Sequence, residues 1–361
     1  MSEKQALQAI RQKIDDIDLQ VQVLLNQRAN MAQEVANIKI ANGEQTDFYR
    51  PDREAMVLRQ VMERNQGPLD SQEMARLFRE IMSACLAAEK PLQVAYLGPE
   101  GSFTQGATLK QFGGSIAPKP MSTISDVFNA VEQGNANYGV VPVENSTEGM
   151  VSHTLDRFIT TPLKINGEIS LRIHHYLLSK ETSLSDVVKI YSHPQALAQC
   201  RQWLANHCPD CELIAVNSNS KAAEMVASER GSAAIAANKA AEIYYLVTLA
   251  SNIEDEVDNT TRFLVIGRQD ISPSGHDKTA LLVSTKNEPG ALNTILEPLA
   301  KSGITMTRIE SRPSRQGVWE YVFFIDIEGH REDSNIAKAL AELKEASSMF
   351  KVLGSYPKAV L

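Results

Sequence analysis

Apolar side chains in the first forty residues recur in alternating steps of three and four residues. The positions in this seam are Leu7, Ile10, Ile14, Ile17, Val21, Leu24, Arg28, Met31, Val35 and Ile38. So long a repeat is typical of a helix that pairs with another helix, as in a coiled coil. The first ninety residues offer too little apolar surface to cover this helix, so we expect two copies of the chain to pair through it.

Arg28 is the single charged residue in that seam. A guanidinium keeps its proton and is costly to bury without a partner. It either sets the register of the helix pair or binds an anionic ligand. Lys39 lies on the same helix face, roughly 16 Å further along the axis. Arg11 lies roughly 25 Å away in the other direction, so it reaches the same ligand only from a partner helix. Arg11 and Lys39, each taken alone, are equally typical of solvated charges beside a seam.

The pattern divides the chain into three regions. Residues 1–91 predict an all-helical domain, in which Pro51 begins a second helix and Asp70 caps a third. Over residues 92–268 short apolar strands alternate with helical segments, which predicts an α/β domain with largely parallel sheets. After a polar linker, residues 279–356 follow a βαββαβ order, the plan of an α+β ferredoxin-like domain.

Composition and charge narrow the function classes. The net charge of −8 argues against a nucleic-acid partner. No apolar run approaches the length of a membrane span and the N-terminus lacks a signal-peptide pattern, so we expect a cytoplasmic protein without a membrane partner. Cys200, His207, Cys208 and Cys211 are close in sequence, but the second half of a paired zinc motif is missing. The segment GPEGSF differs from the glycine motif for dinucleotides, and we expect neither metal nor cofactor.

In order and pattern, the three regions resemble the family of bifunctional chorismate mutase/prephenate dehydratases with a C-terminal ACT domain. The resemblance implies a helical mutase domain that dimerises, a two-lobed dehydratase domain similar to a periplasmic binding protein, and a regulatory ACT domain. The residues that match the catalytic motif of the mutase are Arg11 from the partner chain, Arg28, Lys39, Arg53 and Glu54.

Three further mutase positions depart from a common form of that motif. Arg50 stands where an aspartate is common, Cys85 where a serine is, and Glu89 where a glutamine is. By the resemblance, Arg50 and Cys85 bind substrate and Glu89 is catalytic. A glutamine donates a hydrogen bond at any pH, but a glutamate does so only when protonated. We therefore expect mutase activity to fall as Glu89 ionises.

The segment from Asn259 to Phe263 matches the Thr-Arg-Phe signature of the dehydratase. The resemblance makes Thr261 its catalytic residue, and Arg262 beside it a substrate-binding residue. Other hydroxyl and amide side chains occur where predicted strands pass into helices, and we expect them to bind substrate carboxylates or to cap helices: Ser102, Thr104, Asn145, Ser146 and Thr147. Glu144 is a second candidate for the acid.

Two segments of the C-terminal region match the effector motifs of the ACT domain. The first supplies Asn287, Gly290, Ala291 and Leu292, and the second supplies Glu310, Ser311, Arg312 and Pro313. In the family these segments bind phenylalanine at an interface between two ACT domains. The alternative is a plain ferredoxin-like module with a glycine at a turn.

Together these features predict an enzyme of phenylalanine biosynthesis. It would convert chorismate to prephenate, and prephenate to phenylpyruvate, under feedback inhibition by L-phenylalanine. A homodimer or larger homo-oligomer would carry both activities. Two alternatives stay open on the sequence: a dehydratase that prefers arogenate, and a non-catalytic amino-acid sensor.

Overall fold

The computed structural model describes residues 3–41, 49–88, 90–285, 288–313 and 321–361. The N-terminal domain consists of three helices, as predicted: α1 (Glu3–Ala41), α2 (Pro51–Arg64) and α3 (Ser71–Ala87). Pro51 occupies the first turn of α2, where a missing N–H is tolerated. Asp70 caps α3 by accepting a hydrogen bond from the backbone nitrogen of Gln72 at 2.8 Å.

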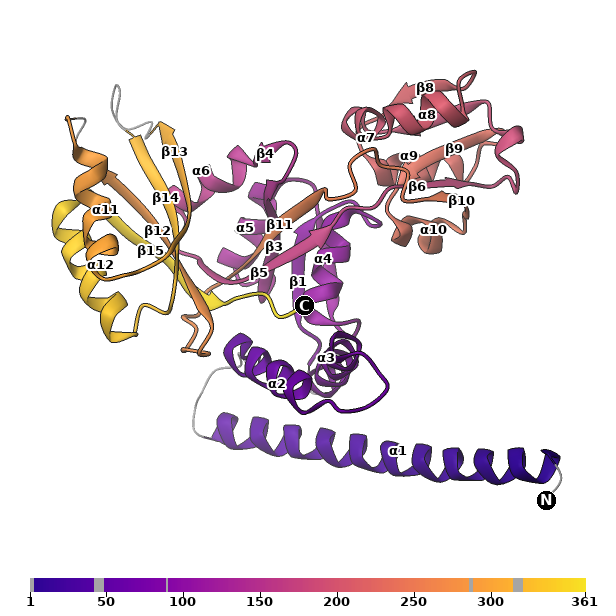
Figure 1. The fold of residues 1–361 in the computed structure, drawn as a ribbon, viewed down its shortest axis with the longest axis horizontal. Helices are drawn as coiled ribbons and strands as arrows, with labels where there is room; N and C mark the ends of the chain where they lie inside the picture. Colours follow the sequence, from indigo (N-terminus) through magenta and orange to yellow (C-terminus); the bar gives the residue numbers. More distant parts are fainter. Residues whose placement is uncertain (1–2, 42–48, 89, 286–287, 314–320) are drawn as a thin grey trace.

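Helix α1 extends far beyond the rest of its domain (Figure 1). Of its residues only Ala36 is buried, and the apolar seam faces outward along most of its length. Ile10, Ile17 and Leu24 are between 55% and 62% exposed. Nothing within the described part of a single chain covers this surface. Among the described residues no helix is both long and apolar enough to cross a membrane.

The middle region forms two lobes, which confirms the two-lobed arrangement. The sheet of the first lobe has the strand order β2-β1-β3-β11-β5, and β4 pairs with β3. The elements of this lobe are β1 (Gln93–Leu97), α4 (Phe103–Phe112), β2 (Ala117–Met121), α5 (Ile124–Glu132), β3 (Tyr138–Asn145), β4 (Gly149–Met150), α6 (Ser152–Thr160), β5 (Lys164–Arg172) and β11 (Thr260–Gly267).

The second lobe is inserted between β5 and β11. Its sheet has the order β10-β6-β9-β7-β8. Its elements are β6 (Tyr176–Ser179), η1 (Leu184–Asp186), β7 (Lys189–Ser192), α7 (Pro194–Gln199), α8 (Arg201–His207), β8 (Glu212–Ala215), α9 (Asn219–Val226), β9 (Ser232–Ala236), α10 (Asn238–Tyr244) and β10 (Val247–Ser251). The chain crosses between the lobes twice, at residues 173–175 and 252–259.

The prediction of largely parallel sheets is wrong. Strand β11 runs antiparallel to both β3 and β5, and β6 runs antiparallel to β9 and β10. The physical reason is the double crossing. Strands β3 and β5 run toward the second lobe. Strand β11 comes back from the second lobe, so it runs in the opposite direction.

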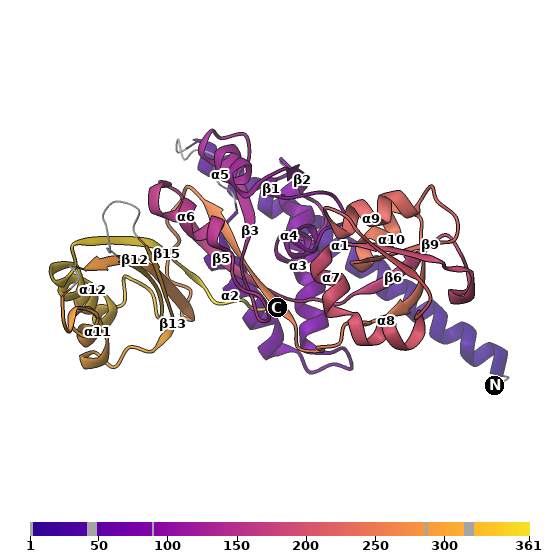
Figure 2. The ribbon, with the colours of Figure 1, turned by 90° about the horizontal axis from the view of Figure 1, so that it is seen from above.

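The C-terminal domain has the predicted βαββαβ order. Its elements are β12 (Asp277–Thr285), α11 (Ala291–Lys301), β13 (Met306–Pro313), β14 (Tyr321–Glu328), α12 (Ser334–Ala346) and β15 (Met349–Pro357). The sheet is antiparallel, with the order β13-β14-β12-β15. The first lobe lies between this domain and the second lobe in both views (Figures 1 and 2).

The C-terminal sheet is buried on both faces. Leu281 and Val283 pack under α11 and α12, whereas their neighbours Ala280 and Leu282 share a core with the first lobe. Strand residues alternate between faces, so one strand serves two cores. The C-terminal domain is therefore fixed to the first lobe by a continuous apolar core.

Close contact between the two sheets leaves no room for a side chain at Gly354. A Cβ there would overlap the backbone oxygen of Ile165 in β5 and lie 2.8 Å from its nitrogen. We expect Gly354→Ala to lower the free energy of unfolding by about 1–3 kcal/mol, because backbone atoms cannot move aside as a flexible side chain can. Urea unfolding of the full chain measures this. Gly167→Ala is the matched control, since its Cβ would lie 3.6 Å from Val265. Equal losses for the two variants would contradict this account of the packing.

Candidate functional site

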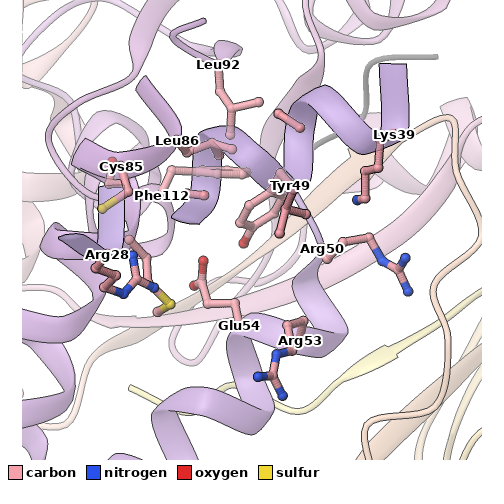
Figure 3. Close-up of a pocket in the computed structure, with 15 residues that line it drawn as sticks. Arg28, Lys39, Tyr49, Arg50, Arg53, Glu54, Cys85, Leu86, Leu92 and Phe112 are labelled. Atoms are coloured by element: carbon pink, nitrogen blue, oxygen red, sulfur yellow. The ribbon is translucent and has the colours of Figure 1, made fainter. Parts of the chain in front are cut away.

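A cationic cavity of about 340 Å³ lies where α1, α2 and α3 meet the first lobe (Figure 3). The predicted mutase residues that line it are Arg28, Lys39, Arg50, Arg53, Glu54 and Cys85. The residues of α1 that line it are Arg28, Ala32, Val35, Ala36 and Lys39, and steps of three and four among them place these residues on one helix face. The small alanine side chains allow α1 to lie close to α3. The long side chains of Arg28 and Lys39 lie at the two ends of this helix face.

The cations of this cavity differ in how they are held. Arg28 and Lys39 are half-buried, while Arg53 is exposed. Arg50 is turned toward Asp52, whose carboxylate accepts from its Nε at 3.1 Å and from its Nη2 at 2.9 Å. Arg28 and Lys39 therefore contribute most of the positive charge that faces the cavity.

Glu54 forms a buried ion pair that the sequence analysis missed. Its Oε1 lies 3.1 Å from Nε of Arg79, and the two side chains are 11% and 6% exposed. Burial raises the pKa of Glu54, and the Arg79 guanidinium opposes that effect. Arg79 also donates to the backbone oxygen of Lys110 in α4 at 2.9 Å. In the sequence, Arg79 stands four residues from each of two small residues, Ala75 and Ser83, so the three share one helix face. All three are buried in the structure.

The remaining predicted mutase residues are Arg11 and Glu89. Arg11 lies on the exposed N-terminal half of α1 and does not line the cavity of its own chain. Glu89 lies outside the described residues. The apolar part of the wall includes Leu92 and Phe112 from the middle region, so the cavity is not a property of the helical domain alone.

A second cavity, of about 310 Å³, lies between the two lobes. The predicted residues Thr104, Asn145 and Thr261 line it on the side of the first lobe. Asn145 Nδ2 donates to Thr261 Oγ1 and to Asn259 Oδ1, both at 2.8 Å. Because Thr261 Oγ1 accepts from Asn145, its hydroxyl hydrogen can be donated to a bound molecule.

The other predicted hydroxyls hold the loops around this cavity. Ser102 caps α4 by accepting from Gln105 N at 3.3 Å, and Ser146 Oγ accepts from Thr260 N at 3.0 Å. Thr147 donates to Asn145 Oδ1 at 2.7 Å and lines an adjoining hollow. In the structure Ser102 caps a helix, and Ser146 and Thr147 brace the loops; a role of these residues in binding substrate stays a prediction.

Arg262 is not brought to the cavity. It follows Thr261 on β11, so its side chain points to the opposite face of the sheet. There its Nη1 lies 2.9 Å from Asp326 Oδ2 in the C-terminal domain. Glu144, the second candidate acid, also points away from the cavity and pairs with Arg308 at 3.1 Å.

Several lining residues were missed because they come from the second lobe or the crossings. They are His175, His193, Gln195, Gln199, Asn219 and Asn259. His175 Nε2 lies 2.9 Å from Gln199 Oε1, and Gln199 Nε2 donates to Thr147 Oγ1 at 3.4 Å, which joins the lobes. Burial lowers the pKa of His175, so its ring is neutral at neutral pH. A signal for this group existed in the segment HPQALAQ, which directly follows a predicted strand.

A third hollow, of about 230 Å³, lies at the start of α11. Gly290, Ala291 and Leu292 line it together with Tyr321 and Phe323 of β14. Gly290 has a φ of +84°, a conformation that favours glycine. Asn287 lies outside the described residues.

The residues of the second effector motif divide between the two faces of β13. Ser311 and Pro313 are the ladder partners of Phe323 and Tyr321, so they face the side of the hollow. Glu310 and Arg312 face the first lobe. Arg312 donates to Ser152 Oγ at 2.6 Å and to Asp156 Oδ1 at 3.0 Å. The structure therefore does not bring all four residues to one pocket.

The cysteine-rich segment of the second lobe does not form a ligand cluster. Within the described residues no group of three or more His, Cys, Asp or Glu side chains is placed to hold a metal ion. All four cysteines are free thiols, and Cys200 and Cys208 are buried in the core of the second lobe. Burial raises the pKa of Cys208 to about 11, so its thiol stays protonated.

Three known families match successive parts of the chain. Residues 10–90 match chorismate mutase type II, residues 94–271 match prephenate dehydratase and residues 279–345 match the ACT domain. A bifunctional chorismate mutase/prephenate dehydratase of Stutzerimonas stutzeri is 55% identical over 365 residues, with 100% of both chains covered.

Two solved structures are similar to the middle and C-terminal regions. The prephenate dehydratase of Arthrobacter aurescens in complex with L-Phe is 36% identical, with a TM-score of 0.68, and the match covers 74% of this chain and 90% of that one. GqqA, described as a novel type of quorum quenching acylase, is 33% identical, with a TM-score of 0.69, and the match covers 74% and 98%. The full-length match, however, is to a protein named as a bifunctional chorismate mutase/prephenate dehydratase. The chain therefore belongs to the bifunctional chorismate mutase/prephenate dehydratase family.

Proposed function

We propose that the cationic cavity is the mutase site, that the cavity between the lobes is the dehydratase site and that the hollow at α11 takes the effector. The corresponding domains are residues 1–91, 92–268 and 279–356. Free thiols throughout the chain fit a reducing compartment, and we infer the cytoplasm.

Rearrangement of chorismate breaks an ether C–O bond and forms a C–C bond within one molecule. The step requires no nucleophile and no proton transfer. The enzyme must hold the two carboxylates so that the side chain folds over the ring, and it must stabilise negative charge on the ether oxygen. Arg28 and Lys39 face one cavity from one helix, and this observation carries the assignment.

Pairing of two chains through α1 would complete this site. The seam of α1 is exposed, and Arg11 lies on the same helix too far from its own cavity. An antiparallel partner helix buries the seam and places its Arg11 beside Arg28. The site would then contain cations from both chains, which a dianionic substrate requires in a protein of net charge −8.

Complementation between two inactive chains tests this shared site. We expect Arg11→Ala and Arg28→Ala each to lower mutase kcat/KM by about a hundredfold, because each removes a cation from the substrate. In a heterodimer with one variant per chain, one of the two sites regains both arginines. Such a heterodimer, purified through two different tags, should recover about half of the wild-type turnover. Lys13→Ala, on the same helix, is the control. An inactive heterodimer would show that Arg11 acts within its own chain, and normal turnover of the Arg11→Ala enzyme by itself would show that Arg11 does not act at all.

Conversion of prephenate to phenylpyruvate releases carbon dioxide and the ring hydroxyl. The electrons of the broken C–C bond aromatise the ring, and the hydroxyl departs as water once it is given a proton. The Asn145–Thr261 hydrogen bond carries this assignment, since it directs a hydroxyl donor into the cavity. Thr261 would orient the leaving hydroxyl. Backbone N–H groups at the start of α4, beside Thr104, would receive a carboxylate.

Neighbouring threonines on β11 provide a matched test of this role. We expect Thr261→Ala to lower dehydratase kcat/KM by about a hundredfold while mutase turnover is unchanged, and Thr261→Ser to retain most of the activity. Thr260→Ala is the control, because Thr260 Oγ1 bonds to the backbone of Asp258 instead. Assays with prephenate and with arogenate also establish the preferred substrate. Normal turnover of the Thr261→Ala enzyme on both would remove Thr261 from the mechanism.

Phenylalanine would act as a feedback inhibitor at the hollow of the C-terminal domain. Tyr321, Phe323 and Leu292 offer an apolar wall for an aromatic ring, and the N–H groups after Gly290 suit a carboxylate. The structure of the Arthrobacter relative in complex with L-Phe supports the ligand class. A second copy of the domain would complete the hollow, because Leu292 is 40% exposed in one chain.

Substitution in the apolar wall tests the effector site. We expect Leu292→Asp to raise the phenylalanine concentration for half-inhibition by about tenfold or more, because a carboxylate would face the bound ring and repel the ligand carboxylate. Turnover without phenylalanine should not change. Titration calorimetry gives the affinity directly, with Lys301→Ala at the exposed end of the same helix as control. Unaltered inhibition of the Leu292→Asp enzyme would place the effector elsewhere.

A further inference from the structure

The two faces of strand β11 contact different parts of the protein. Thr261 and Phe263 line the cavity between the lobes, and Arg262 between them points to the C-terminal domain. The Arg262 side chain is 18% exposed, and its guanidinium has three carboxylates around it, from Asp326 at 2.9 Å, Glu168 at 3.3 Å and Glu144 at 3.5 Å. The residue next to the proposed catalytic threonine is therefore held from the opposite side of the sheet.

Strand β3 repeats this arrangement beside it. Asn145 is the ladder partner of Thr261, and Glu144 is the ladder partner of Arg262. Asn145 faces the cavity, whereas Glu144 binds Arg308 of β13 at 3.1 Å. The Thr261–Asn145 pair therefore faces the cavity, and the charged Arg262–Glu144 pair lies on the opposite face of the sheet. The C-terminal domain contacts both Arg262 and Glu144.

The charges form one compensated cluster, which we call the interdomain network. It consists of Arg262, Arg308 and Lys278 with Glu144, Glu168 and Asp326. Three of these residues come from the C-terminal domain: Lys278, Arg308 and Asp326. Glu168 and Asp326 are 7% and 11% exposed, so removing one partner leaves an uncompensated charge in a dry setting. Such a cluster fixes side-chain positions more strongly than an exposed ion pair does.

Strand β14 links this network to the proposed effector hollow. Phe323 lines the hollow, and Asp326 follows three residues later, roughly 10 Å along the strand. A shift of β14 at the hollow would act on Arg262 through Asp326.

We propose that Asp326 and Arg308 are positioning residues for the dehydratase reaction. By holding Arg262 and Glu144, they set the positions of Thr261 and Asn145 in the cavity. The C-terminal domain is then part of the catalytic framework, and its effector controls turnover through the same contacts. This inference rests on the proposed dehydratase site.

Two aspartates that pair with arginines across the same interface allow a matched experiment. Asp326 and Asp156 lie 2.9 and 3.0 Å from their partners, but Asp156 is on α6 and pairs with Arg312 of β13, so this second pair involves neither β3 nor β11. We expect Asp326→Asn in the full chain to lower dehydratase kcat by about tenfold or more with a smaller change in KM, because the catalytic hydroxyl is misplaced after substrate binds. Asp156→Asn should change kcat by less than about twofold.

Three further measurements separate the possible causes. Mutase turnover of the same preparations should be normal, which excludes general misfolding. Asp326→Glu keeps the charge and should restore most of the dehydratase kcat. Asp326→Asn should also need more phenylalanine for the same fractional inhibition.

Equal dehydratase kcat in the Asp326→Asn and Asp156→Asn enzymes would overturn the positioning role while leaving the site assignment intact. If Asp326→Asn also loses mutase turnover, Arg308→Gln replaces it in the test, because Arg308 holds Glu144. A dehydratase kcat equal to that of Asp156→Asn would again overturn the positioning role. Failure of the site assignment would be visible separately, as normal turnover of Thr261→Ala.

Discussion

The insertion of β11 between β3 and β5 is the contact on which the middle of this protein depends. The chain leaves the first lobe after β5, builds the whole second lobe and returns antiparallel into the same sheet. That return joins β5 to the rest of the first sheet through β11. It makes the second lobe an insertion with two connections, and the cavity lies between the two lobes. It also brings Thr261 beside Asn145, which lies over a hundred residues earlier in the chain.

The two candidate active sites offer different groups to an anionic ligand. Side-chain cations line the cavity at α1, which we propose as the mutase site and which a second chain would complete. None of the described residues that line the cavity between the lobes is a lysine or arginine. Amides, hydroxyls, imidazoles, the Glu148 carboxyl group and the start of α4 surround it instead. A lining without a fixed cation suits the proposed reaction, since a nearby cation would hold the carboxylate that must be lost.

The three modules share surfaces more closely than a series of independent domains would. Phe112 at the end of α4 lines the cationic cavity at α1, and Phe103 at its beginning lines the cavity between the lobes. Arg79 connects Glu54 to the backbone of α4, and the C-terminal sheet shares an apolar core with the first lobe. These packed contacts give a change in one module a physical route to the next.

The sequence by itself determined the elements whose signals are local. The seam of α1, the proline that begins α2 and the βαββαβ order follow from spacing and from residues at helix ends, and the structure agrees with them. It also identified the segments that carry Arg28, Lys39, Asn145 and Thr261, because each lies within a short recognisable motif. Only the tertiary structure decided which face of each strand meets a cavity. Arg262 is adjacent to Thr261 yet points to another domain, and Arg79, His175 and Gln199 gain their roles from partners far away in sequence. Strand direction and face are set by long-range pairing and core packing, which no local pattern encodes.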